Sequence, residues 1–128
     1  MTRKLQHIAC IDDDEDILRI AELTLESLGG YKVTTFMSGP AALAGLKEAA
    51  PDLVLLDMMM PKMDGRQTLE AIKSRDDLKH LPVVFMTAKI QPAERSQYGS
   101  LGAAGVVAKP FDPATLASDV ETIWRTLN

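Results

Sequence analysis

Polar side chains follow four short apolar runs of this chain, at the point where each run ends. Each run is bounded by turn residues, and such a pattern is typical of a buried β-strand. Buried strands that alternate with helical segments indicate a parallel sheet, whose carboxyl-terminal edge is where ligands bind. The sequence therefore gathers carboxylates, a hydroxyl and an ammonium at one edge, a set suited to a divalent cation beside a phosphoryl group. The residues are Asp12, Asp13 and Asp14 after Ile8–Ile11, Asp57 after Leu53–Leu56, Thr87 after Val83–Met86, and Lys109 after Val106–Ala108.

The acidic residues favour a metal ion. Taken alone, the triplet at residues 12–14 also fits a solvated loop, and we expect Asp14 to be a helix N-cap. Asp12 and Asp13, however, are expected to crowd Asp57, and two carboxylates about 5 Å apart repel by about 3 kcal/mol at an effective dielectric of about 20. A cation offsets this repulsion. Carboxylate oxygens favour Mg²⁺, and the absence of His and Cys from the set argues against zinc.

Three of these residues have both a chemical and a structural interpretation. Asp57 is either a third metal ligand or a nucleophile that forms an acyl phosphate. Lys109 is either a surface lysine or a cation that neutralises a phosphoryl oxygen. Thr87 is either a β-branched strand residue or a hydroxyl donor to the same phosphoryl group. No single residue decides, but their joint spacing favours phosphoryl chemistry.

The rest of the pattern predicts an alternation of five strands and five helices. We expect strands at about 5–11, 32–36, 52–56, 83–87 and 106–108, and helices at about 15–28, 39–50, 92–101 and 113–127, with a further helix after Asp64 that contains Leu69 and Ile72. The fourth helix has little to bury and is expected to be weakly held. The expected N-caps are Asp14, Ser38, Asp64 and Asp112. The expected buried faces are Ile17, Ala21, Leu25 and Leu28 in the first helix, and Leu116, Val120, Ile123, Trp124 and Leu127 in the last.

Length and composition limit the class of protein. With 128 residues, 46% of them hydrophobic, we expect one folded domain covering residues 1–128. The net charge of −4 argues against a nucleic-acid partner. No apolar run reaches the length of about 18 residues that spans a membrane, and the first residues do not resemble a secretory signal, so we expect a cytoplasmic protein. Cys10 is expected to be a small buried residue.

Taken together, these segments resemble the receiver domain of two-component response regulators, of the stand-alone type. The resemblance covers nearly the whole chain, through residues 11–14, 55–65, 81–88, 102–105 and 109–111. It implies a flavodoxin-like, doubly wound α/β fold with a five-stranded parallel sheet in the order 2-1-3-4-5 and five helices. It also implies a cis bond between Lys109 and Pro110.

The resemblance implies a phosphorelay function. Asp57 would receive a phosphoryl group from a sensor histidine kinase or a histidine phosphotransfer domain, and the domain would not be a turnover enzyme. The surface around the fourth helix would then switch to control a downstream protein. Thr87 and Lys109 would bind the phosphoryl oxygens. The implied Mg²⁺ ligands are Asp12, Asp13, Asp57 and the backbone carbonyl of Met59.

One departure from the family pattern changes the expected switch. The family usually has Tyr or Phe three residues before the lysine, and here that residue is Val106. We therefore expect signalling through Thr87, Ala88 and the fourth helix. Other interpretations remain: a passive phosphate carrier, a receiver fragment of a longer regulator or hybrid kinase, or a binding module without phosphate. An aspartyl phosphatase usually has a second Asp two residues after its nucleophile, where this chain has Met59.

Overall fold

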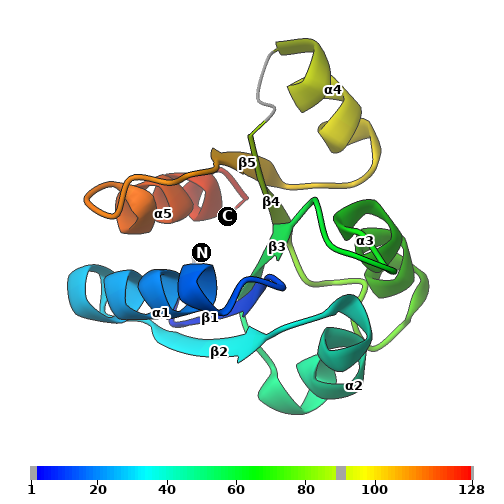
Figure 1. Ribbon diagram of the computed structural model, residues 1–128, viewed down its shortest axis with the longest axis horizontal. Helices are drawn as coiled ribbons and strands as arrows, with labels where there is room; N and C mark the ends of the chain where they lie inside the picture. The colour runs from blue at the N-terminus through cyan, green and yellow to red at the C-terminus, as the bar shows by residue number, and fades with distance from the viewer. Residues whose placement is uncertain (1–2, 89–91, 128) are drawn as a thin grey trace.

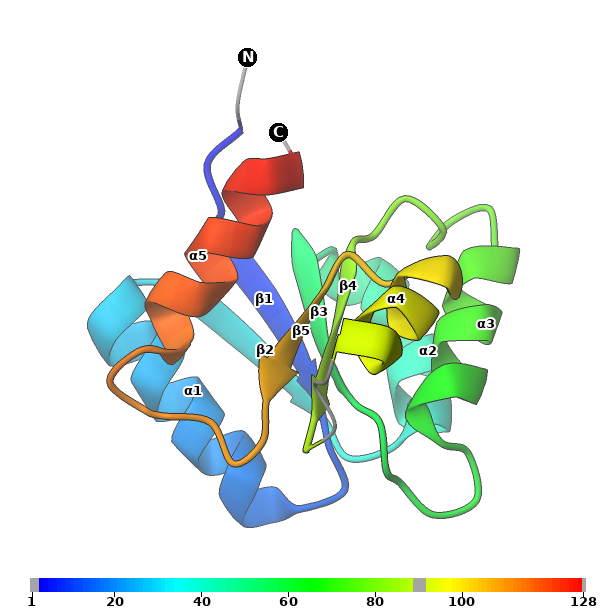
Figure 2. The same ribbon diagram turned by 90° about the horizontal axis from the view of Figure 1, so that it is seen from above.

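One parallel sheet with helices on both faces forms the protein (Figures 1 and 2). The computed structural model describes residues 3–88 and 92–127. Within these residues the strand order is β2-β1-β3-β4-β5, so the predicted doubly wound fold is confirmed. The strands are β1 (His7–Ile11), β2 (Lys32–Phe36), β3 (Leu53–Asp57), β4 (Val83–Thr87) and β5 (Gly105–Ala108). The helices are α1 (Glu15–Gly29), α2 (Gly39–Ala49), α3 (Gly65–Ser74), α4 (Pro92–Ser100) and α5 (Leu116–Leu127).

Two apolar cores lie on opposite faces of the sheet. Because strand side chains alternate, Ile8 and Cys10 of β1 point to the face covered by α1 and α5, whereas Ala9 and Ile11 point to the other core (Figure 1). The central strands β3 and β4 are buried at every position, whereas β2 at the sheet edge is partly exposed. The sheet is thus fixed from both sides, and the ends of its strands are held in register.

The predicted N-caps of the first three helices are confirmed. Asp14 accepts hydrogen bonds from the first turn of α1, and Ser38 accepts one from Ala41. Asp64 and Gln67 form a reciprocal capping box at the start of α3. At the other end of α1, Gly30 adopts the left-handed conformation with φ of 70°, which favours glycine.

The predicted buried face of α1 is partly wrong. Leu28 has 64% of its surface exposed, and Ile17 is only half-buried, whereas Leu18, Ala21 and Leu25 are buried. The buried ring of Tyr31 packs against Gly29 and fills the space under the last turn. Leu28 is therefore turned toward solvent.

The predicted N-cap of α5 is partly confirmed, and the end of the helix differs from the prediction. Oδ1 of Asp112 accepts from the backbone N–H of Ala114 at 2.9 Å, as an N-cap does, and its carbonyl accepts from Thr115 and Leu116. A turn follows Asp112, and the regular helix starts only at Leu116. Leu127 is 44% exposed rather than buried. The last apolar position is filled by Trp124, whose indole N–H donates to the carbonyl of Arg3 at 2.7 Å. The Arg3 guanidinium also lies 5.6 Å from the centre of the Trp124 ring.

Helix α4 has few contacts with the core, as predicted. Among its described side chains, only that of Tyr98 is buried, and its ring meets Phe85 edge-on with 5.4 Å between ring centres. In the part of the chain that the structure describes, no helix is long and apolar enough to cross a membrane.

The buried thiol of Cys10 gives a test of the core. Burial raises its pKa to about 12, and the side chain is fully inaccessible. We expect a thiol reagent at pH 8 to label Cys10 only in denaturant, measured by intact mass. The raised pKa also lowers the free energy of unfolding above about pH 9, because the unfolded thiol then ionises while the folded thiol stays neutral. Rapid labelling of the native protein would contradict this structure of β1.

Candidate functional site

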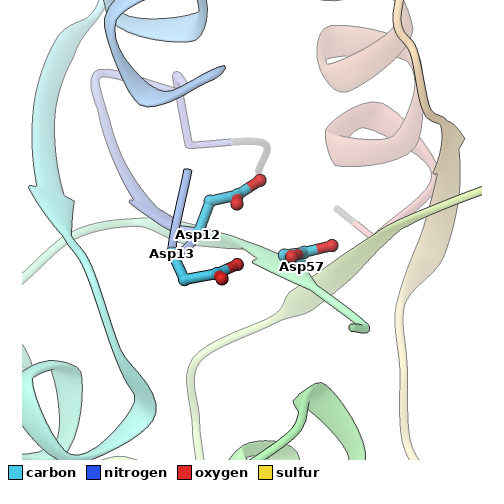
Figure 3. Close-up of side chains that lie close together, drawn as sticks. All are labelled: Asp12, Asp13 and Asp57. Atoms are coloured by element: carbon cyan, nitrogen blue, oxygen red, sulfur yellow. The ribbon is translucent and has the colours of Figure 1, made fainter. Parts of the chain in front are cut away.

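Three carboxylates meet at the carboxyl-terminal edge of β1 and β3, as Figure 3 shows. Asp12 and Asp13 directly follow β1, and Asp57 is the last residue of β3. Ile11 pairs with Leu56 in the sheet, so the next residue of each strand reaches the same level. One carboxylate oxygen from each of the three residues lies within 4.8 Å of the others. The predicted crowding is therefore confirmed.

Lys109 lies beside two of these carboxylates. Its Nζ is 2.8 Å from Asp12 Oδ2 and 3.1 Å from Asp57 Oδ1. Burial lowers the pKa of Lys109, but the hydrogen bonds to Asp12 and Asp57 outweigh this effect and the net pKa is raised. The ammonium is therefore charged at neutral pH. The bond between Lys109 and Pro110 is cis, as the resemblance implied.

Burial and the neighbouring charge of Asp12 raise the pKa of Asp57, while the hydrogen bond and charge of Lys109 oppose them. By formal charge, three carboxylates beside one ammonium give this small region an excess of two negative charges. A divalent cation neutralises such an excess, and an all-oxygen set of ligands suits a hard ion.

The two oxygens of Asp57 have different surroundings. Oδ1 accepts from Lys109 and, at 3.4 Å, from the backbone N–H of Met59. Oδ2 is buried and has no hydrogen-bond partner among residues 3–88 and 92–127. A buried oxygen without a partner is unfavourable, and a metal ion or an electrophilic phosphorus supplies the missing interaction. The residues present therefore fit a bound Mg²⁺.

Thr87 lies at the same edge, on the neighbouring strand. It is 4% exposed and ends β4, one position after Met86, which pairs with Asp57. The backbone N–H of Lys109 donates to the Thr87 carbonyl at 3.0 Å, so the ends of β4 and β5 are joined. Four of the predicted site residues thus converge, namely Asp12, Asp57, Thr87 and Lys109, and Asp13 lies beside them at the more exposed rim.

The loop after β3 holds Met59 beside Asp57. Met60 is buried, with 8% of its surface exposed, whereas the side chain of Met59 is 77% exposed. In the described structure Met59 contacts the site through its backbone N–H.

Gly65 was missed in the sequence as a site residue. A Cβ there would lie 2.5 Å from the carbonyl oxygen of Asp57 and 2.7 Å from Cα of Met58. Only glycine therefore lets α3 start this close to the end of β3. The sequence did contain a signal for this role. Glycine is unfavourable within helices, yet a glycine directly follows the N-cap Asp64 at the start of α3.

Comparison with known proteins identifies the family. The family model for the response regulator receiver domain matches residues 8–121. The chain belongs to this family. Receiver domains act in two-component phosphorelay signalling, interact with histidine kinases or phosphotransfer proteins, and generally bind Mg²⁺.

Similar proteins include whole regulators and isolated domains. Over 92% of this chain, the sequence is 38% identical to the response regulator PleD of Caulobacter vibrioides. Over 96% of this chain, it is 34% identical to the probable transcriptional regulator ycf27 of Porphyridium aerugineum. It spans only 26% and 50% of these two relatives.

Two solved structures match this chain over nearly the full length of both partners in the comparison. The chemotaxis response regulator CheY4 of Vibrio cholerae is 28% identical, with a TM-score of 0.84 over 94% of this chain and 99% of that one. The N-terminal domain of a receiver protein from Methanoculleus marisnigri is 38% identical, with a TM-score of 0.75 over 93% of this receiver domain and 96% of the other.

Charge repulsion at the acidic site gives a prediction about stability. We expect Asp13→Asn to raise the melting temperature of the metal-free domain, because it removes one of three crowded negative charges. The same change should reduce the stabilisation by Mg²⁺, which at about 100 times its dissociation constant is about 2.7 kcal/mol for the unmodified domain.

The measurement is thermal unfolding with and without Mg²⁺. Glu48→Gln, at an exposed position of α2, makes the same change of charge away from the site and serves as control. A melting temperature of the unmodified domain that is independent of Mg²⁺ would exclude the metal site.

Proposed function

We propose that this receiver domain accepts a phosphoryl group on Asp57 from a phosphohistidine of a sensor histidine kinase or histidine phosphotransfer domain. The observation that carries the proposal is the buried Oδ2 of Asp57, which lacks a partner among the described residues and lies in a carboxyl group paired with Lys109. An oxygen in this position is a nucleophile with no competing hydrogen bond. The domain is the acceptor of the group and not a turnover enzyme.

The proposed transfer is a single displacement at phosphorus. A bond forms between Asp57 Oδ2 and phosphorus while the bond from phosphorus to the histidine nitrogen breaks, and its electron pair returns to the imidazole. Lys109, now paired with Asp12 and Asp57, is placed to bind a phosphoryl oxygen as charge develops there. In this proposal the hydroxyl of Thr87, at the end of the neighbouring strand, donates to another of these oxygens.

A bound Mg²⁺ would neutralise charge on the phosphoryl oxygens. Its ligands in this proposal are carboxylate oxygens of Asp12, Asp13 and Asp57 together with the backbone carbonyl of Met59. The clustering of the three carboxylates and the excess of negative charge support this assignment.

Phosphoacceptor activity can be tested directly. With acetyl phosphate and Mg²⁺, intact mass should show one added phosphoryl group, and Asp57→Asn should abolish it. Asp64→Asn is a matched control, since asparagine also caps a helix and the residue lies in the same loop. Chelation of Mg²⁺ should prevent labelling of the unmodified domain. Equal labelling of Asp57→Asn would show that the assigned acceptor is wrong.

We further propose that phosphorylation changes the position of α4. Thr87 ends the strand that leads toward α4, and a hollow of about 310 Å³ lined by Met59, Thr87, Ala88 and Tyr98, among others, separates the site loop from this helix. Val106 is half-buried, and a second hollow of about 170 Å³ lies beside it. Both spaces leave room for α4 to move, since only one of its described side chains is buried.

Hydrogen exchange with and without beryllofluoride should reveal this switch. We expect altered exchange between Ala88 and Leu101, although residues 89–91 of that range lie outside the described structure. Helix α5 should be unchanged because its apolar face is packed against the sheet. Changes confined to Val106 and α5 would contradict the proposal. A response limited to the loop after Asp57 would instead indicate a passive phosphate carrier.

A further inference from the structure

The loop from residue 58 to residue 64 must keep Met59 beside Asp57 for the proposed chemistry. Its ends are fixed by hydrogen bonds from Met58 N to Met86 O at 3.2 Å and from Gly65 N to Met58 O at 2.9 Å. The middle of the loop has a tight turn, where Met63 N donates to Pro61 O at 2.7 Å. These bonds fix the two ends, but they leave open what stops the outer part of the loop from moving away from the site.

The outer part of the loop packs against the first residue of α2. A Cβ on Gly39 would lie 2.6 Å from Sδ and 3.1 Å from Cγ of Met63, and it would also overlap Oγ1 of Thr68. Real Cβ atoms do not approach other atoms this closely, so any side chain at residue 39 must displace a neighbour. Gly39 does not have a positive φ, and the requirement is therefore one of space rather than of backbone conformation.

Thr68 connects this contact to the loop and cannot easily move. It is fully buried, and its hydroxyl donates to the carbonyl of Asp64 at 2.8 Å. Asp64 is both the last residue of the loop and the N-cap of α3. If Thr68 is displaced, Asp64 and with it the end of the loop are expected to move. If Met63 is displaced, the loop itself moves, because Met63 is part of it.

A second contact prevents α3 from simply moving away from α2. Just after α3, Arg75 donates from Nη1 to the carbonyl of Leu43 in α2 at 2.6 Å. Its guanidinium is oriented by two further bonds to Asp77, of 3.0 and 2.7 Å. Because the two helices are joined at that end, crowding at Gly39 is expected to displace the loop.

From these contacts we infer that Gly39 is a positioning residue for the phosphoacceptor site. Its missing side chain lets Met63 and Thr68 pack against α2, which holds the loop so that Met59 lies beside Asp57. The residue contacts neither the carboxylates nor the reacting group, and acts only through the loop. The effect on Mg²⁺ and on phosphorylation rests on the proposed function. The claim that Gly39 holds the loop in place does not.

The test compares two glycines of the same helix. Gly39→Ala should weaken Mg²⁺ binding by about tenfold, a typical effect of disturbing residues that orient metal ligands, measured by calorimetric titration. It should also speed hydrogen exchange at the amides of Met59 and Gly65 in the metal-free domain. Gly45→Ala is the matched control, since its Cβ would lie 2.6 Å from the ring of Phe36, to which the three nearest atoms all belong. This control should lower the melting temperature without speeding exchange at the amides of Met59 and Gly65.

A double variant tests the route through Met63. With Met63→Ala present, the further change Gly39→Ala should weaken Mg²⁺ binding less than it does alone, since one of the two crowded neighbours has been removed. If Gly39→Ala fails to fold, Met63→Ala alone should still weaken Mg²⁺ binding, because the loop loses its contact with α2.

Unchanged Mg²⁺ affinity and unchanged loop exchange in Gly39→Ala would overturn the inference, as would an equal effect of Gly45→Ala on exchange in the loop. Failure of the unmodified domain to bind Mg²⁺ or to accept phosphate would instead refute the proposed function. In that case, exchange at Met59 and Gly65 would still decide whether Gly39 holds the loop.

Discussion

Mutual repulsion among Asp12, Asp13 and Asp57 is the constraint on which the rest of this structure depends. At separations below 5 Å, such charges oppose each other by several kcal/mol at an effective dielectric of about 20. Lys109 offsets only part of this repulsion, and the remaining negative charge is suited to a divalent cation. The apolar cores on both faces of the sheet supply the stability that lets the strand ends hold like charges together.

The elements around the site differ in how firmly they are held. Strands β1, β3 and β4 are buried on both faces, and the loop after β3 is fixed by Gly65, the capping box of Asp64 and the contact with Gly39. Helix α4, in contrast, contributes one buried aromatic ring among its described side chains. Asp57 therefore lies between firmly held strands and the loop after β3 on one side and the weakly held helix α4 on the other. This difference favours a directed response over a general loosening.

The sequence was sufficient for the fold and for the convergence of the site residues because both follow from strand ends. Asp57, Thr87 and Lys109 each follow an apolar run that forms a strand. Because parallel strands end at the same edge of a sheet, these side chains must lie at one edge. The errors concern properties that a local pattern does not contain. Leu28 is exposed because Tyr31, from beyond the helix, fills its expected place, and the close contacts of Gly39 and Gly65 involve neighbours on other elements. The strand order and the cis bond before Pro110 came from the resemblance to the family, not from the apolar pattern.

The position of the single tryptophan has a consequence for spectroscopy. Trp124 is held by the carbonyl and guanidinium of Arg3, and it lines a hollow with Pro82 and Ala104, which precede β4 and β5. The indole therefore lies at the amino-terminal edge of the sheet, opposite the carboxylates. Its fluorescence is therefore sensitive to the contact between Arg3 and α5 and is remote from the chemistry at Asp57. An optical signal for phosphorylation in this domain requires a reporter introduced at the other edge.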